Sequence, residues 1–258
     1  GGRSTEAARA SPAAAPAAAP APGAAAPARG RNAAPPSPEQ VAAQQASAEA
    51  LRKWRLSAPM SRLKEFRKKW SRAGVAIQIV KFDWISPLPS DDILEYCFEM
   101  AKALGARAIS TEVPLARMDD TKRLGEVADK HKIWVGYHGH AAVNAAVWER
   151  AFSYAKYNGA NLDLGHFVAG NNTSPIPFMK QHHDRITHMH VKDRKLQNGP
   201  NVPFGQGDTP IKEALQLLRD NKWKIQATVE FEYPVPAGSD RMTEIAKCVE
   251  YCKSCLIS

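Results

Sequence analysis

From residue 75 onward, the hydrophobic positions of this chain fall into short continuous runs with amphipathic stretches between them. Six runs have the length and the β-branched content of buried strands, namely 75–80, 108–113, 133–138, 161–164, 186–191 and 227–231. A stretch with helical periodicity precedes each run, and the clearest are Ser61 to Ala73, ended by Gly74, and Asp91 to Leu104, ended by Gly105. This alternation predicts an α/β fold in which helices cover a parallel sheet.

The number of strands narrows the architecture further. A closed TIM-type (β/α) barrel needs eight strands, and nothing in residues 1–56 has the pattern of a strand. We therefore predict a TIM-type barrel that lacks the first two βα units, with six strands visible. A doubly wound open sheet is the structural alternative, but no Gly-rich phosphate-binding loop follows any of the runs.

The N-terminal part of the chain has a different composition. Residues 1–36 are dominated by Ala and Pro and contain almost no large apolar side chains, so they cannot bury enough surface to offset the entropy of ordering and are expected to be disordered. A basic helix is expected over 37–56, because Ser37 can cap its start and Gln40 can reach back to the cap. The barrel is expected over 57–258.

The net charge of +9 is not spread evenly along the chain. Residues 1–75 hold 13 Lys and Arg against 4 Asp and Glu, whereas residues 76–258 hold 22 of each. We interpret the excess as a solvated tail and helix rather than a nucleic-acid surface. The chain shows no initiator Met, no apolar leader and no run of 18 apolar residues, so neither a signal peptide nor a membrane span is expected. The location stays open between the cytoplasm and export from a bacterial cell.

Polar residues stand at the ends of four of the apolar runs. They lie in the segments Tyr-His-Gly-His at 137–140, Leu-Asp-Leu-Gly-His at 162–166, His-Met-His-Val-Lys-Asp at 188–193 and Val-Glu-Phe-Glu at 229–232. Parallel strands present their C-terminal ends on one rim of a barrel, so these residues are expected to converge. Imidazoles and carboxylates are ligands of divalent cations, and the sequence therefore predicts a metal site.

Each position also has a structural interpretation. Asp163 lies in an otherwise apolar strand, where an unpaired carboxylate would cost several kcal/mol, so either a cation or a salt bridge must be near. His138 and His140 share strand parity, which favours at least one ligand but also fits a hydrogen-bonded structural pair. Lys192 is either a substrate contact or the partner of an ion pair with Glu230 or Asp193.

These segments, together with Gly-Gln-Gly-Asp at 205–208, resemble the sugar phosphate isomerase/epimerase superfamily, also described as xylose isomerase-like TIM barrels, over about residues 58–258. The resemblance implies a divalent metal, Mn²⁺, Mg²⁺, Co²⁺ or Zn²⁺, held by side chains from the fifth to the eighth strands of the family barrel. Those side chains map here to His138, Asp163, His190 and Glu230. The expected substrate contacts are His140, His166 and Lys192, although His166 also fits a helix-start cap.

The resemblance implies a metal-dependent isomerase or epimerase of a sugar, keto-sugar or polyol. Such an enzyme works through an enediolate, formed when a base removes the α-proton of the substrate. Better-studied epimerases of the superfamily place a glutamate where His138 stands, so Glu112, on the preceding strand, is the candidate substitute, and either Glu230 or Glu112 is the expected base. The same intermediate also leads to β-elimination, so a lyase or dehydratase stays open. The implied partners are a small-molecule substrate and a second copy in a homo-oligomer; nucleic acid and membrane are not expected.

Two further functions are weighed against this one. Abasic-site endonucleases of the same superfamily share Asp163, His166, His190 and Glu230, but they carry an Asp-Arg-His triplet where this chain has Pro-Asn-Val-Pro at 200–203. That difference and the balanced charge of residues 76–258 argue against DNA cleavage. A non-catalytic sugar-binding domain is the other alternative, since two strands are missing and His138 replaces a carboxylate.

Overall fold

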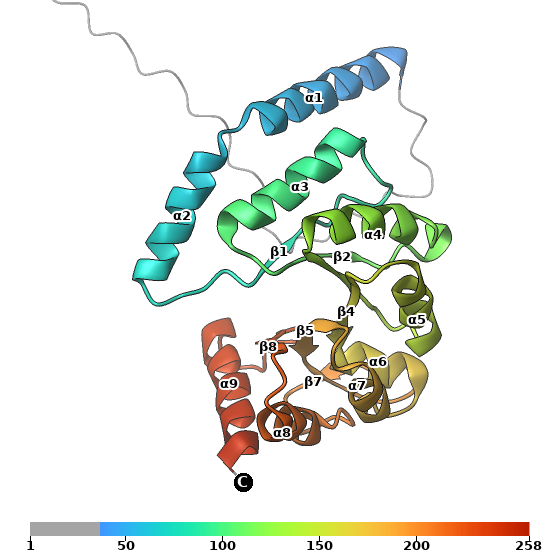
Figure 1. Cartoon of the computed structure of the whole chain (residues 1–258). Helices are drawn as coiled ribbons and strands as arrows, with labels where there is room; N and C mark the ends of the chain where they lie inside the picture. Colours follow the sequence, from blue (N-terminus) through green and yellow to red (C-terminus); the bar gives the residue numbers. More distant parts are fainter. Residues whose placement is uncertain (1–36, 258) are drawn as a thin grey trace, which may run out of the picture. The chain divides into compact units, whose positions relative to one another are not determined.

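Six strands form one open, curled parallel sheet (Figure 1). The computed structural model describes residues 37–257, so the Ala/Pro-rich segment 1–36 lies outside the described residues. The sheet consists of β1 (Ile79–Lys81), β2 (Ala108–Glu112), β3 (Trp134–His138), β4 (Asn158–Asp163), β5 (Ile186–Val191) and β8 (Gln226–Val229). They lie in the order β1-β2-β3-β4-β5-β8, and every neighbouring pair is parallel. The predicted α/β architecture, a TIM-type barrel without its first two βα units, is confirmed.

Helices connect the strands, and the first three helices, which are those with predicted ranges, match those ranges to within a residue. The chain divides after Ala48 into two units, and all strands belong to the second unit. None of the helices between residues 37 and 257 has both the length and the hydropathy needed to cross a bilayer. The helices are α1 (Pro38–Ser57), α2 (Met60–Arg72), α3 (Asp91–Leu104), α4 (Asp120–His131), α5 (Ala145–Tyr154), α6 (Leu164–Asn171), α7 (Ile176–His182), α8 (Ile211–Asn221) and α9 (Arg241–Ile257).

The structure contains a short turn and a short strand pair that were not predicted from the sequence, and it confirms the predicted cap at the start of α1. A 3₁₀ turn, η1 (Leu115–Arg117), follows β2, and an antiparallel pair joins β6 (Asp193–Arg194) to β7 (Asn201–Val202). At the start of α1, the backbone N–H of Gln40 donates to Oγ of Ser37 at 3.2 Å, and the N–H of Ser37 donates to Oε1 of Gln40 at 2.9 Å. This reciprocal capping satisfies two backbone donors that have no partner inside the helix.

The first and last predicted strands are shorter and more exposed than the sequence suggests. Residues 75–78 are not part of β1, and Val75 is 43% exposed, so the prediction of a buried strand over 75–80 was wrong in extent. The last strand ends at Val229 rather than at residue 231, and three of its four residues are exposed. Both are edge strands with one neighbour each. Their apolar side chains therefore lack the second neighbour that would cover them.

The central strands separate two environments. Ile109, Val135, Leu162 and Met189 are almost completely buried in the core shared with the helices, and burial of each such side chain stabilises the fold by about 1.5–3 kcal/mol. Because alternate residues of a strand point to opposite faces, the neighbours of these residues point to the concave face instead. Asp163, next to Leu162, is one of them.

Candidate metal centre

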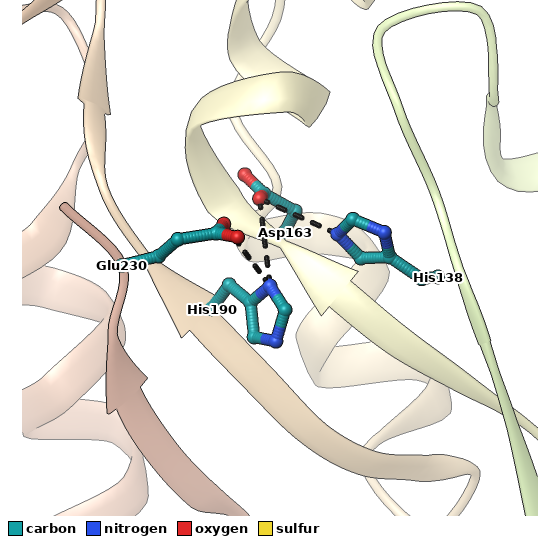
Figure 2. Close-up of side chains that lie close together, drawn as sticks. All are labelled: His138, Asp163, His190 and Glu230. Atoms are coloured by element: carbon teal, nitrogen blue, oxygen red, sulfur yellow. Dashed lines mark hydrogen bonds and ion pairs between the residues drawn. The ribbon is translucent and has the colours of Figure 1, made fainter. Parts of the chain in front are cut away.

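Four neighbouring strands bring the predicted ligands together. His138 is the last residue of β3, Asp163 is the last residue of β4, His190 lies one residue before the end of β5, and Glu230 directly follows β8. Asp163 and His190 are paired directly across β4 and β5, so the backbone register sets their separation. Figure 2 shows the four side chains pointing toward a common centre.

The distances within this group are those of a shared cation site. Oδ2 of Asp163 lies 3.6 Å from Nε2 of His138 and 3.8 Å from Nδ1 of His190, and the same Nδ1 lies 3.1 Å from Oε2 of Glu230. One ligand atom from each of the four residues lies within 4.8 Å of every other. Two imidazole nitrogens and two carboxylate oxygens form a donor set that suits Zn²⁺ and Mn²⁺.

The buried polar atoms of this group also fit a cation. Nε2 of His138 and Oδ2 of Asp163 are both buried and make no hydrogen bond within residues 37–257, although Oδ2 forms an ion pair with the ammonium of Lys192 at 3.0 Å. The other nitrogen of His138, Nδ1, faces a carboxylate and therefore carries a proton. A neutral imidazole would thus direct a lone pair at a carboxylate oxygen, and a proton or a cation must lie between the two atoms. The residues present fit a divalent metal.

Lys192 lies against the same oxygens. Its ammonium is 3.0 Å from Oδ2 of Asp163 and 2.7 Å from Oε2 of both Glu230 and Glu232, and its side chain is only 2% exposed. Burial alone would lower the pKa of Lys192, but Asp163 and Glu230 outweigh burial and raise it. The lysine is therefore a charged group that neutralises part of the carboxylate cluster.

Glu112 and two histidines form a second group next to the first. The carboxylate of Glu112 is 3.1 Å from Nδ1 of His138 and 3.0 Å from Nε2 of His140, and Oε1 is 3.1 Å from Nζ of Lys81. Burial would raise the pKa of Glu112, but the two histidines and Lys81 hold it well below its usual range. Burial would likewise lower the pKa of His138, but Asp163 and Glu112 raise it to about 9. His138 thus belongs to both groups.

His166 is held by Asp163 rather than acting as a cap itself. Asp163 caps α6, since its Oδ1 accepts the backbone N–H of His166 at 2.8 Å. The ring of His166 lies 3.1 Å from Nζ of Lys192 and 2.7 Å from the guanidinium of Arg194. Burial lowers the pKa of His166 to about 4, and both cations act in the same direction. A side chain at Gly165 would collide with the stem of Lys192, so this glycine permits the close approach.

The Gly-x-Gly-Asp loop has a structural anchor in Asp193. The Asp193 carboxylate accepts the backbone N–H groups of Gly205 and Gly207 at 2.8 Å each, and that of Thr209 at 3.2 Å. Gly205 has a φ of +85°, a conformation that strains other residues. Asp193 therefore orders the loop that precedes α8. Of the two ion-pair partners expected for Lys192, it is Glu230 and not Asp193 that contacts the ammonium.

Sequence reasoning did not identify three polar residues that contact the site. The amide of Asn161 lies 3.4 Å from Nε2 of His190, Arg194 contacts His166, and Lys81 contacts Glu112. Asn161 could have been found, because it lies two residues before Asp163 and so points to the same face of β4. Arg194 and Lys81 carry no comparable signal, since an arginine or a lysine at a strand end is usually solvated.

Comparison with known proteins identifies the family. The family model described as "Xylose isomerase-like TIM barrel" matches residues 52–255, whereas no curated protein matches the sequence. Similar solved structures include the probable 3-DHS dehydratase AsbF of Bacillus anthracis, with 14% identity, a TM-score of 0.55 and coverage of 73% of this chain and 79% of that chain. The IOLI protein with a bound zinc atom has 14% identity, a TM-score of 0.58 and coverage of 80% and 84%. D-psicose 3-epimerase of Clostridium cellulolyticum H10, with D-tagatose, has 11% identity, a TM-score of 0.58 and coverage of 77% and 84%. With its fold and its sequence match both established, the chain belongs to the xylose isomerase-like TIM barrel family.

Proposed function

We propose that this protein is a metal-dependent enzyme that isomerises or epimerises a sugar, keto-sugar or related polyol. The observation that carries the proposal is the convergence of His138, Asp163, His190 and Glu230 on one centre that contains buried atoms without hydrogen bonds. The similarity to a psicose 3-epimerase and to a zinc-containing protein of the same fold supports it. These four residues are the proposed metal ligands.

A divalent cation held there would bind neighbouring oxygens of the substrate and offset the negative charge that develops when the α-proton leaves. Glu230 is the proposed base. Its pKa is lowered, because His190 and Lys192 outweigh the effect of burial, so the carboxylate is ionised at neutral pH. Lys192 forms ion pairs with Glu230 and Asp163, and it is also the proposed contact for a substrate oxygen. His140, whose side chain is 60% exposed, and His166 are the proposed contacts for substrate hydroxyls.

Hydrogen exchange tests this proposal most directly. Protein loaded with Mn²⁺ is incubated with a panel of keto-sugars in deuterated water, and incorporation of deuterium next to the carbonyl is followed by NMR. We expect exchange that is lost on chelation and that falls by at least 10³-fold in E230Q. The matched control is E250Q, because Glu250 is an exposed carboxylate on α9 whose ion pair is with its helix neighbour Lys253. A metal-loaded wild-type protein that exchanges no hydrogen with any keto-sugar contradicts the proposal.

A β-eliminating lyase or dehydratase is the second candidate, and one observation favours it. His138 stands where epimerases of the superfamily carry a second carboxylate, and elimination needs a base on only one side of the substrate carbon. AsbF, one of the structural neighbours, is described as a probable dehydratase. Elimination creates a conjugated carbonyl, so the appearance of ultraviolet absorbance with loss of water, instead of an epimer, distinguishes the two reactions.

A further inference from the structure

Glu112 borders the proposed metal site, and its carboxylate already has three partners. Lys81, His138 and His140 all lie within 3.1 Å of its oxygens. Glu112 and His138 are directly paired across β2 and β3, so the backbone fixes their spacing. Three donors occupy three of the roughly four lone-pair sites of the carboxylate, which leaves about one site for a proton from a substrate.

The contact between Glu112 and His138 determines which imidazole nitrogen faces the cluster. A carboxylate only accepts hydrogen bonds, so Nδ1 of His138 donates, and Nε2 is left to face Oδ2 of Asp163 at 3.6 Å. Histidines that ligate metals usually donate their second N–H to a carboxylate, which fixes both the tautomer and the ring orientation. Glu112 is the carboxylate that accepts the second N–H of His138 in this way.

The same carboxylate also reaches the rim of the site. Glu112 lies 3.0 Å from Nε2 of His140, whose exposed ring also packs against the rings of His138 and His166, with centroid distances of 4.7 and 4.8 Å. The contact with Glu112 adds to these ring contacts and restricts the rotamers of the exposed imidazole further. One carboxylate therefore holds two histidines, of which His138 faces the proposed metal and His140 faces the proposed substrate.

We propose that Glu112 is a positioning residue that directs Nε2 of His138 at the metal and fixes His140 at the rim, and that it is not the base. The inference rests on the proposed function, because it takes His138 as a metal ligand. It reassigns Glu112 from the role of base that the sequence suggested.

Two variants separate the hydrogen bond from the charge. E112Q and E112A both lack the negative charge, but only the glutamine can accept the N–H of His138. We therefore expect Zn²⁺, measured by calorimetry at one fixed pH, to bind E112A at least tenfold more weakly than E112Q. In the Zn²⁺-loaded protein, the Nδ1 proton of His138 is expected to stay visible by NMR in E112Q and to exchange faster in E112A. Equal Zn²⁺ affinities of two variants with native circular dichroism spectra would overturn the inference.

Hydrogen exchange distinguishes positioning from base catalysis. If Glu112 positions the histidines, E112Q retains exchange within about tenfold of the wild type, whereas loss of a base costs 10³-fold or more. Loss of that size in E112Q, with Zn²⁺ affinity preserved, would make Glu112 the base and overturn the inference. If the wild type itself exchanges no hydrogen, the proposed function fails, and the comparison of Zn²⁺ affinities still decides the role of Glu112.

Discussion

Metal binding to this protein is expected to displace one proton from His138. The metal-free protein holds that proton strongly, because Asp163 and Glu112 outweigh burial and raise the pKa of His138 to about 9. A metal ligand must be neutral at the coordinating nitrogen. At pH 7, two units below that pKa, binding is therefore weakened about 100-fold, or about 2.7 kcal/mol, relative to a neutral imidazole.

Calorimetry in buffers with different heats of ionisation measures the protons released on binding. We expect about one proton per Mn²⁺ at pH 7, and a dissociation constant that falls about tenfold for each unit from pH 6 to pH 8. H138A should lose the proton release together with most of the affinity. H183A is the control, because His183 is exposed and stacks on Trp223, away from the cluster. Proton release near zero in the wild type, or an affinity independent of pH, would refute this reasoning.

Three further outcomes are expected. In the metal-free protein, the stability contributed by His138 is complete below pH 6.5 and is lost as the pH rises through 9, about 3 kcal/mol in all. The pKa of about 4 for His166 gives a stabilising contribution that is instead lost as the pH falls from 6.5 to 4. Urea unfolding in a chelator should therefore find the greatest stability near pH 6.5, and a monotonic rise in stability up to pH 9 would contradict this expectation. K192M leaves three carboxylates together without their buried partner, so the free energy of unfolding of the metal-free protein should fall by about 3–5 kcal/mol. Added Mn²⁺ should raise the Tm of K192M more than that of the wild type. The surface variant K253M should match the wild type in unfolding free energy and in the Tm shift. D193A removes the acceptor of three backbone N–H groups, and a drop in unfolding free energy of about 2–3 kcal/mol is expected; an unchanged urea midpoint would show that the loop needs no anchor.

The parts of the fold that follow from local pattern could be predicted from the sequence. Buried strands and their helices are short-range features, and the predicted helix over Asp91–Leu104 matches α3 in full. The two edge strands were misjudged, because an apolar run indicates burial only when a neighbouring strand covers it. That neighbour is a property of the whole sheet, and β1 and β8 lack it.

The candidate site was predictable where side-chain type and strand parity agree. The apolar pattern predicted polar residues at the ends of four strands, the family resemblance selected His138, Asp163, His190 and Glu230 among them as ligands, and the register of parallel strands brings the four together. The partners of Glu112 were not predictable, since its contacts with Lys81 and His140 depend on rotamers and on sheet curvature.

The open side of the sheet bears on the fate of an abstracted hydrogen. A cavity of about 540 Å³ lies between β1 and β8, and its lining includes Asn161, His188 and His190. Bulk water can thus approach the cluster from the flank as well as from the mouth of the strands. A hydrogen taken from one substrate molecule would then equilibrate with the medium before it could return, so a doubly labelled substrate mixture should show washout rather than internal transfer.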